Sequence, residues 1–197
     1  MLKFFAFLYG LVFAKACDSD IDRAIDKVGE VVNENIPLSK EKLLIGQWKS
    51  DTTIHDTDEI DGEVVSYQMQ FSCKTEYFPT DTFNSDCEMT ISYTGLPMKM
   101  VFDAYFTGTW QIDGEYLYTV TEDMKMNLAS VQIEQKIISD PIEVRQIQKD
   151  IWDGEKIEDL MPKKETTKYE VLVLDQTRLV TQSEAEGQMI TENSIRL

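Results

Sequence analysis

Apolar and polar residues alternate through the middle of the chain, from Leu43 onward. In "YQMQFSCKTEY" every second residue over 67–73 is apolar or cysteine, and the residues between them are polar. "CEMTISY" repeats the pattern over 87–93, and "MKMVFDAYFTGTW" repeats it over 98–110. A period of two is typical of a strand with one buried face and one wet face. The pattern therefore predicts an antiparallel meander.

The turn sequence "IDGEY" decides which face of the next strand is buried. A two-residue loop at Asp113-Gly114 would turn Tyr116, Tyr118 and Val120 outward. A three-residue loop, with Gly114 in the left-handed conformation, would keep the apolar face continuous. We expect the three-residue loop, which directs the following side chains inward: Tyr116, Tyr118, Val120, Met124, Met126 and Leu128.

Two segments change the period to that of a helix. "DSDIDRAIDKVGEVVNENIP" has apolar residues at helical spacing, and we assign 17–42 to a short amphipathic helix and a linker. In "SDPIEVRQIQKDIW", Asp140 is suited to the N-cap, Pro141 to the first helical position and Glu143 to a capping box. We predict a helical insert over 139–165, after which strands resume. The predicted fold class is mainly β: an antiparallel up-and-down β-barrel of about eight strands over 43–197.

The first sixteen residues form a segment of a different kind. "MLKFFAFLYGLVFAKA" combines an early lysine, an apolar run and an Ala-x-Ala ending, which is the form of a secretory signal peptide. We expect 1–16 to be removed and the protein to be exported, to the periplasm or cell envelope, or secreted as a soluble protein.

Export makes the three cysteines interpretable. Cys73 and Cys87 flank the turn signal "FPTD", and an oxidising compartment would join them in a disulfide. Two unpaired buried thiols are the alternative. Cys17 follows the expected cleavage site and resembles the first mature residue of a bacterial lipoprotein, which carries a diacylglycerol. Ala14 and Lys15 depart from that family's pattern, so membrane attachment through a lipid on Cys17 and simple cleavage to a soluble protein both stay open.

The first strand of the predicted barrel opens on Gly46-Gln47-Trp48. With the meander that follows, this resembles the lipocalin-like (calycin) superfamily over roughly 43–197. The resemblance implies that Trp48 closes one end of an eight-stranded barrel and that an arginine of the last strand stacks over it, a position that Arg196 fits. The helical insert, the early disulfide and the missing middle lipocalin motifs depart from the family.

Charge and residue types exclude several classes of function. With 19 basic and 36 acidic residues the formal charge is −17, which argues against nucleic-acid binding. His55 is the single histidine, and no phosphate-binding loop or nucleophile motif occurs. The acidic stretch "HDTDEIDGE" misses EF-hand spacing, and the two Met-x-Met elements suit core packing better than copper. We predict no catalytic residue, metal or cofactor.

The barrel interior is then the predicted functional site. We expect a carrier of a small apolar molecule, with a cavity lined by aromatic and methionine side chains: Tyr67, Met69, Phe71, Met89, Tyr93, Met100, Phe102, Phe106 and Tyr118. The alternative is a structural or adaptor protein of the cell envelope with a solid barrel, since large apolar side chains can fill a small barrel completely. The sequence identifies no protein partner.

Overall fold

The computed structural model describes residues 38–60, 63–151, 164–185 and 188–197. The predicted signal peptide, the predicted N-terminal helix and 152–163 of the insert lie outside these residues. The elements are, in chain order, α2 (Lys40–Leu44), β1 (Gly46–Ile60), β2 (Glu63–Tyr77), β3 (Thr82–Tyr93), β4 (Met98–Asp113), β5 (Tyr116–Ile133), β6 (Lys136–Ile138), α3 (Pro141–Ile151), β7 (Glu165–Leu174), β8 (Arg178–Ala185) and β9 (Gln188–Arg196).

The strands form one antiparallel sheet that closes on itself. The hydrogen-bonded order is β4-β3-β2-β1-β9-β8-β7-β5-β6, and an additional β4–β5 pairing completes the circle. The three-residue β6 pairs only with the end of β5. The other eight strands form a closed barrel, and the predicted fold class is confirmed. Such a barrel is compatible with a lipocalin-like fold.

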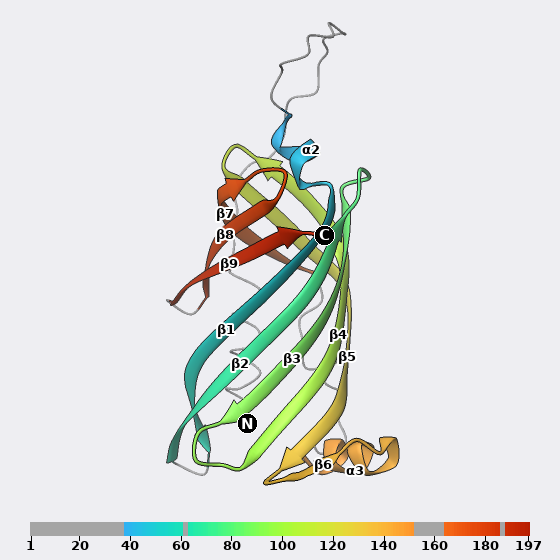
Figure 1. Cartoon of the computed structure of the whole chain (residues 1–197), viewed down its shortest axis with the longest axis vertical. Coiled ribbons are helices and arrows are strands. Elements are labelled where there is room, and N and C mark those ends of the chain that lie inside the picture. The colour runs from blue at the N-terminus through green and yellow to red at the C-terminus, as the bar shows by residue number, and fades with distance from the viewer. Residues whose placement is uncertain (1–37, 61–62, 152–163, 186–187) are drawn as a thin grey trace, which may run out of the picture.

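The barrel has one long side and one short side. Strands β1–β5 contain 12 to 18 residues, whereas β7–β9 contain 8 to 10. The seam between β1 and β9 covers only Trp48–Ser50 against Ser194–Arg196. Figure 1 shows β7, β8 and β9 beside the α2 end of the long strands, with β6 and α3 at the opposite end. The circle of strands is therefore complete only toward the α2 end.

The predicted alternation in β2, β3 and β4 is present in the structure. The buried residues of β4 are Met100, Phe102, Ala104, Gly108 and Trp110, with Met98 and Phe106 partly buried. On β3 the buried apolar positions are Phe83, Cys87, Met89 and Ile91. Residues 67 and 69 of β2 are also buried. Period two thus located the inner face of these strands correctly.

The prediction of a three-residue loop after β4 is wrong. Asp113 pairs with Tyr116, so a two-residue loop at Gly114-Glu115 joins the strands. The inward residues at the start of β5 are Leu117, Thr119 and Thr121, while Tyr116 is exposed. The β4–β5 ladder then contains two register shifts. At each of them β5 has one extra residue, Glu122 at the first and Ala129 at the second. Each bulge changes which alternate residues of the strand face inward. After the bulge at Glu122 the even-numbered residues face inward, so Met126 and Leu128 are buried as predicted.

Backbone packing explains one of these bulges. A Cβ added to Gly108 would lie 1.9 Å from the carbonyl oxygen of Val120. The two strands therefore approach more closely at Gly108 than any other residue would permit. The register shift lies between Thr107 and Gly108, directly beside this close approach.

The helices cap the two ends of the long strands. We expected extended structure from Leu43, but 40–44 form α2, and Leu44 is fully buried against the barrel. At the other end α3 starts as predicted, since Asp140 Oδ1 accepts hydrogen bonds from the backbone N–H groups of Ile142 and Glu143. Val144 of α3 is buried in the apolar cluster that the long strands enclose.

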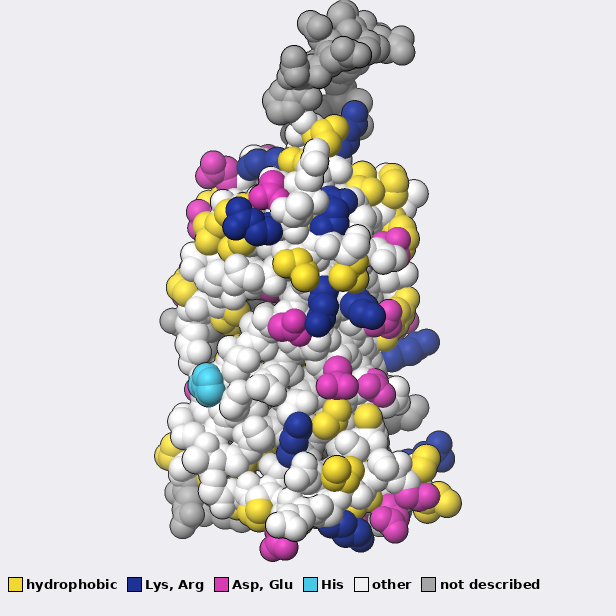
Figure 2. All heavy atoms as spheres, viewed as in Figure 1, with side chains coloured by type: hydrophobic (Ala, Val, Ile, Leu, Met, Phe, Trp, Pro, Cys, Tyr) yellow, Lys and Arg dark blue, Asp and Glu magenta, His cyan; other side chains and the backbone are white. Residues whose placement is uncertain are grey.

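The outer surface carries charges of both signs. Figure 2 shows Lys and Arg interspersed with Asp and Glu over one face of the molecule, with apolar side chains scattered among them. Within the described residues, no helix combines the length and apolar character needed to cross a membrane.

Candidate functional site

Trp48 and Arg196 close the barrel at the α2 end, as the resemblance implied. They are directly paired on β1 and β9, and the guanidinium carbon lies 4.5 Å from the centre of the indole. The indole is 1% exposed, and its Nε1 donates to the carbonyl of Leu44 at 2.7 Å. Nη1 of Arg196 donates to the carbonyl of Ile45 at 2.9 Å, and Nη2 donates to that of Leu43. Arg196 therefore neutralises the carbonyl end of α2 while covering the tryptophan.

Gly46 leaves room for this arrangement. Its φ is +131°, and a Cβ built on it would lie 2.6 Å from Nη1 of Arg196. Glycine meets both demands because it has no Cβ and adopts positive φ at low cost. The Gly-x-Trp pattern thus has a structural explanation at both of its defining positions.

Below this closure the barrel contains a cavity of about 170 Å³. It separates two apolar clusters, one around Trp48 and Trp110 and the other around Met69 and Phe102. The lining residues are Trp48, Ser50, Thr52, Ile54, Phe71, Cys73, Thr75, Tyr77, Phe83, Ser85, Cys87, Phe106, Leu117, Thr119, Thr121, Tyr169, Leu179, Thr181, Ser183, Ile190, Glu192 and Ser194. A dry 150 Å³ cavity accommodates benzene, so this cavity has room for a ligand of about that size or slightly larger.

The cavity lies elsewhere than the sequence predicted. Of the nine expected wall residues, Phe71 and Phe106 line it. The others pack in the second cluster, nearer α3: Tyr67, Met69, Met89, Tyr93, Met100 and Phe102. Tyr118 was expected inside but pairs with Lys168, whose ammonium lies 5.9 Å from the tyrosine ring. The expected wall was wrong for the six residues of the second cluster because large side chains fill the space that they face. It was wrong for Tyr118 because the two-residue loop before β5 turns that side chain away from the interior.

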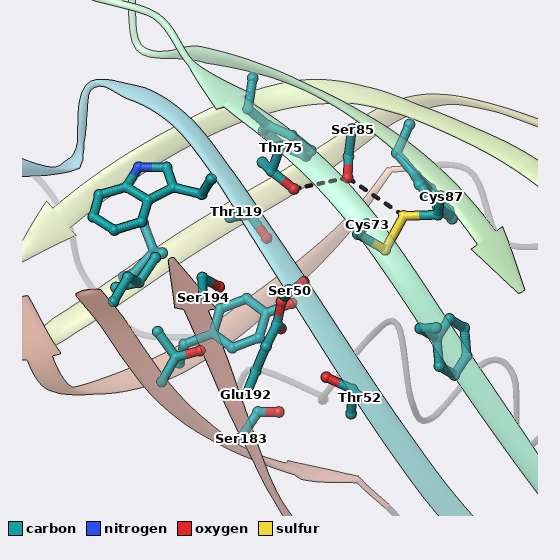
Figure 3. Close-up of a pocket in the computed structure, with 18 of the residues that line it drawn as sticks. Ser50, Thr52, Cys73, Thr75, Ser85, Cys87, Thr119, Ser183, Glu192 and Ser194 are labelled. Atoms are coloured by element: carbon teal, nitrogen blue, oxygen red, sulfur yellow. Dashed lines mark hydrogen bonds between the residues drawn. A yellow bond between two sulfur atoms is a disulfide. The ribbon is translucent and has the colours of Figure 1, made fainter. Parts of the chain in front are cut away.

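Small hydroxyl side chains create the cavity, and the wall predicted from the sequence contained none of them. Nine serine and threonine residues line it: Ser50, Thr52, Thr75, Ser85, Thr119, Thr121, Thr181, Ser183 and Ser194. They come from β1, β2, β3, β5, β8 and β9, and Figure 3 labels at least one from each of these strands. Their small volumes leave space between the two apolar clusters, and their hydroxyls make the middle of the interior polar. The available signal was the occurrence of Ser or Thr at inward positions of several strands at once.

Glu192 is the one charged side chain among the lining residues of the described structure. Burial raises the pKa of its carboxyl, and a hydrogen bond with Ser50 opposes that rise. Burial also raises the pKa values of Tyr77 and Tyr169 above the ordinary range, and the nearby Glu192 charge raises both further. The titratable groups of the described lining are thus two phenols and a carboxyl.

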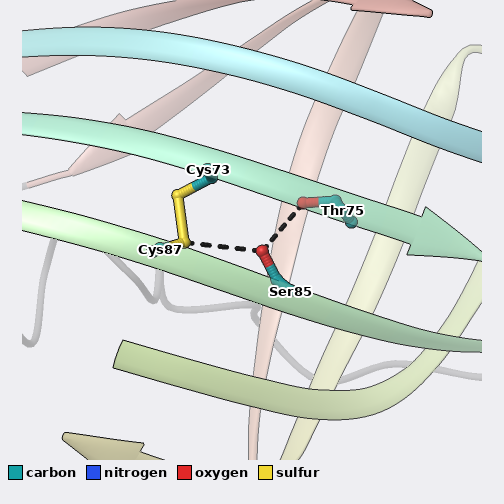
Figure 4. The surroundings of a disulfide bond; sticks show 4 residues. All are labelled: Cys73, Thr75, Ser85 and Cys87. Atoms are coloured by element: carbon teal, nitrogen blue, oxygen red, sulfur yellow. Dashed lines mark hydrogen bonds between the residues drawn. A yellow bond between two sulfur atoms is a disulfide. The ribbon is translucent and has the colours of Figure 1, made fainter. Parts of the chain in front are cut away.

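The disulfide between Cys73 and Cys87 lies in the cavity wall. The two residues are opposite each other on β2 and β3, with 4.1 Å between their Cα atoms. The hydroxyls of Thr75 and Ser85 are 2.8 Å apart, and the Ser85 hydroxyl lies 3.5 Å from the Cys87 sulfur (Figure 4). This pairing is the predicted one, and it is consistent with an oxidising compartment.

The groups present suit recognition by hydrogen bonds. The lining offers many hydroxyls that donate or accept, one carboxyl and several aromatic faces. His55 is exposed and lies outside the lining, so no imidazole contacts these groups. Among the described residues, no group of His, Cys, Asp and Glu has an arrangement suited to a metal ion.

Comparison with known protein families found no match to this sequence, and comparison with curated proteins found no significantly similar one.

Proposed function

We propose that this protein is an exported, lipocalin-like binding protein that holds a small molecule in the barrel cavity and does not catalyse its conversion. The observation that carries the proposal is the cavity itself, with its belt of hydroxyls and one carboxyl between two apolar clusters. Ligand sites are concave and mostly apolar, with a few polar groups that fix orientation. This cavity has that composition.

The geometry changes the class of ligand from the one predicted. A wholly apolar ligand would limit the lining hydroxyls and Glu192 to hydrogen bonds within the wall, such as Thr75 with Ser85 and Glu192 with Ser50, and would exclude water from their remaining donor and acceptor positions. A ligand with both an apolar part and hydrogen-bonding groups satisfies both parts of the wall. The cavity volume of about 170 Å³ restricts it to a small molecule.

Export is supported by the disulfide. Disulfides persist in oxidising compartments and are rare in reducing ones, and Cys73 and Cys87 are placed to form one. A signal peptide over 1–16 and lipidation of Cys17 complete the proposal, and both lie outside the described residues. Periplasmic or cell-envelope attachment and soluble secretion are the two destinations that follow from lipidation and from simple cleavage.

Solid packing around Met69 and Phe102 favours a second candidate function. Thirteen buried residues form that cluster, so much of the barrel has the filled interior expected of a structural or adaptor protein. Such a protein would act through its outer surface and would leave the cavity to water.

Native mass spectrometry of the protein isolated from its natural source separates the two functions. We expect a bound small molecule in the wild type and its loss in Ser183→Leu, because the larger side chain fills the cavity. Thr191→Leu is the matched control, since Thr191 is exposed on the neighbouring strand β9. A wild-type protein that repeatedly carries no small molecule would contradict the binding function and favour the adaptor.

A further inference from the structure

Among the described residues that line the cavity, none is a permanent counter-ion for Glu192. These residues include no lysine, arginine or histidine, and their other titratable groups are Tyr77 and Tyr169. Arg196 lies two positions further along β9, but its guanidinium is directed to the carbonyls of α2 and to the face of Trp48. An isolated charge in an enclosed site is costly unless it is paired. Ser50 gives the carboxyl a hydrogen-bond partner, but the described lining gives it no cationic one, and a cation bound in the cavity would supply it.

Aromatic rings surround the same space. The aromatic residues that line the cavity are Trp48, Phe71, Tyr77, Phe83, Phe106 and Tyr169. The negative face of an aromatic ring attracts a cation, and the attraction grows where water is excluded. Hydroxyls such as those of Ser50 and Thr52, which Figure 3 labels near Glu192, can accept further hydrogen bonds from an ammonium group.

The charge of the whole chain acts in the same direction. A formal charge of −17 creates a negative potential around the molecule, which raises the local concentration of cations and slows the approach of anions. A cationic ligand is thus favoured both during approach and after entry.

We propose that the cavity binds a small organic monocation, a protonated amine with an apolar body, and that Glu192 is its counter-ion. This inference rests on the proposed binding function and adds the charge of the ligand to it. The carboxylate accepts hydrogen bonds from the ammonium, the hydroxyls satisfy its remaining N–H groups, and the apolar body contacts the rings. The volume of about 170 Å³ limits the ligand to roughly the size of a single substituted ring.

Calorimetric titration with three probes of one shape tests the sign of the charge: benzylammonium, benzyl alcohol and benzoate. We expect benzylammonium to bind wild-type protein at least about tenfold more tightly than benzyl alcohol, a difference of about 1.4 kcal/mol, and benzoate to show no binding. In Glu192→Gln the benzylammonium affinity should fall by about tenfold while that of benzyl alcohol stays unchanged. Glu184→Gln, an exposed acid on β8, should behave as wild type.

The outcomes separate the two proposals. Equal affinities of the wild type for benzylammonium and benzyl alcohol would overturn the choice of a cation and leave the binding cavity in place. Failure of all three probes to bind would overturn the amine proposal, and native mass spectrometry would still decide the binding function independently. Unchanged benzylammonium binding in Glu192→Gln would overturn the role of that residue.

A second measurement keeps the proposal testable if Glu192→Gln does not fold. In wild-type protein, benzylammonium affinity should rise as the pH is raised from about 4, the ordinary pKa of a glutamate, because burial shifts the ionisation of Glu192 to higher pH. Benzyl alcohol affinity should stay flat across the same range, since neither partner needs a charge. A flat profile for benzylammonium would overturn the proposal.

Discussion

At the scale of single residues, the barrel closure depends on atoms that fit one another closely. Arg196 serves three neighbours at once: the face of Trp48 and the carbonyls of Leu43 and Ile45. Gly46 adjoins the same guanidinium. A side chain added at Gly46 therefore disturbs the arginine, the helix end and the tryptophan together.

We predict that Gly46→Ala lowers the free energy of unfolding by about 1–3 kcal/mol, from positive-φ strain and from contact with Arg196. Gly95→Ala is the matched control: its φ is +84°, but no atom lies within 4 Å of the added Cβ. Urea unfolding of both variants measures the difference. Equal losses in the two variants would show that the arginine yields without cost.

At the scale of elements, the residues that face the interior could be predicted from the two-residue period wherever a strand kept its register. The inner faces of β2, β3 and β4 could be predicted because each residue's side is fixed by its distance along the strand. The inner face of the whole of β5 could not be predicted in this way. Its bulges at Glu122 and Ala129 depend on how β5 pairs with β4, and a local pattern holds no information about the partner strand.

The disulfide is an element-scale constraint that joins β2 to β3. We predict that Cys73→Ala combined with Cys87→Ala lowers the free energy of unfolding by about 3 kcal/mol, because the unfolded chain regains the freedom of the closed loop. Urea unfolding measures the change. Wild-type protein in reductant should lose a similar amount, and the double variant should not respond to reductant. An unaltered unfolding midpoint in the double variant would contradict this expectation.

At the scale of the whole molecule, the closed circle of strands creates a buried polar interior whose ionisation couples to folding. Glu192 comes from β9, Tyr77 from β2 and Tyr169 from β7, and all three line one cavity. Burial raises the pKa of each. These groups take up protons on folding only because the barrel brings them together away from water.

The pH dependence of stability follows from the direction of these shifts. Below about pH 4 the Glu192 carboxyl is protonated in both folded and unfolded chains and contributes no pH dependence. As the pH rises above that value the unfolded chain ionises first, so stability falls until the folded carboxyl ionises as well. Above about pH 10 the two tyrosines add a further loss by the same mechanism.

We therefore predict that Glu192→Gln is as stable as wild type near pH 4 and more stable near pH 8, by on the order of 1 kcal/mol. Thermal unfolding across this range measures the difference. In Glu184→Gln, at an exposed position, the unfolding temperature should change with pH in the same way as in wild type. A difference between Glu192→Gln and wild type that does not vary with pH would contradict the assignment of the titrating group.

The sequence by itself determined the features that depend on local periodicity or on an identifiable pair. The β-barrel class and the inner faces of three strands could be predicted because period two couples directly to burial. The Cys73–Cys87 pair followed from the turn between the two cysteines and the expected export, and the Trp48–Arg196 closure from the resemblance to the lipocalin-like superfamily. Only the tertiary structure decided where the interior is empty. The cavity exists because small residues of six strands, among them Ser50, Thr119 and Ser183, meet at one level of the barrel. That coincidence depends on strand register and on the short β7–β9 side, which are properties of pairing between distant segments.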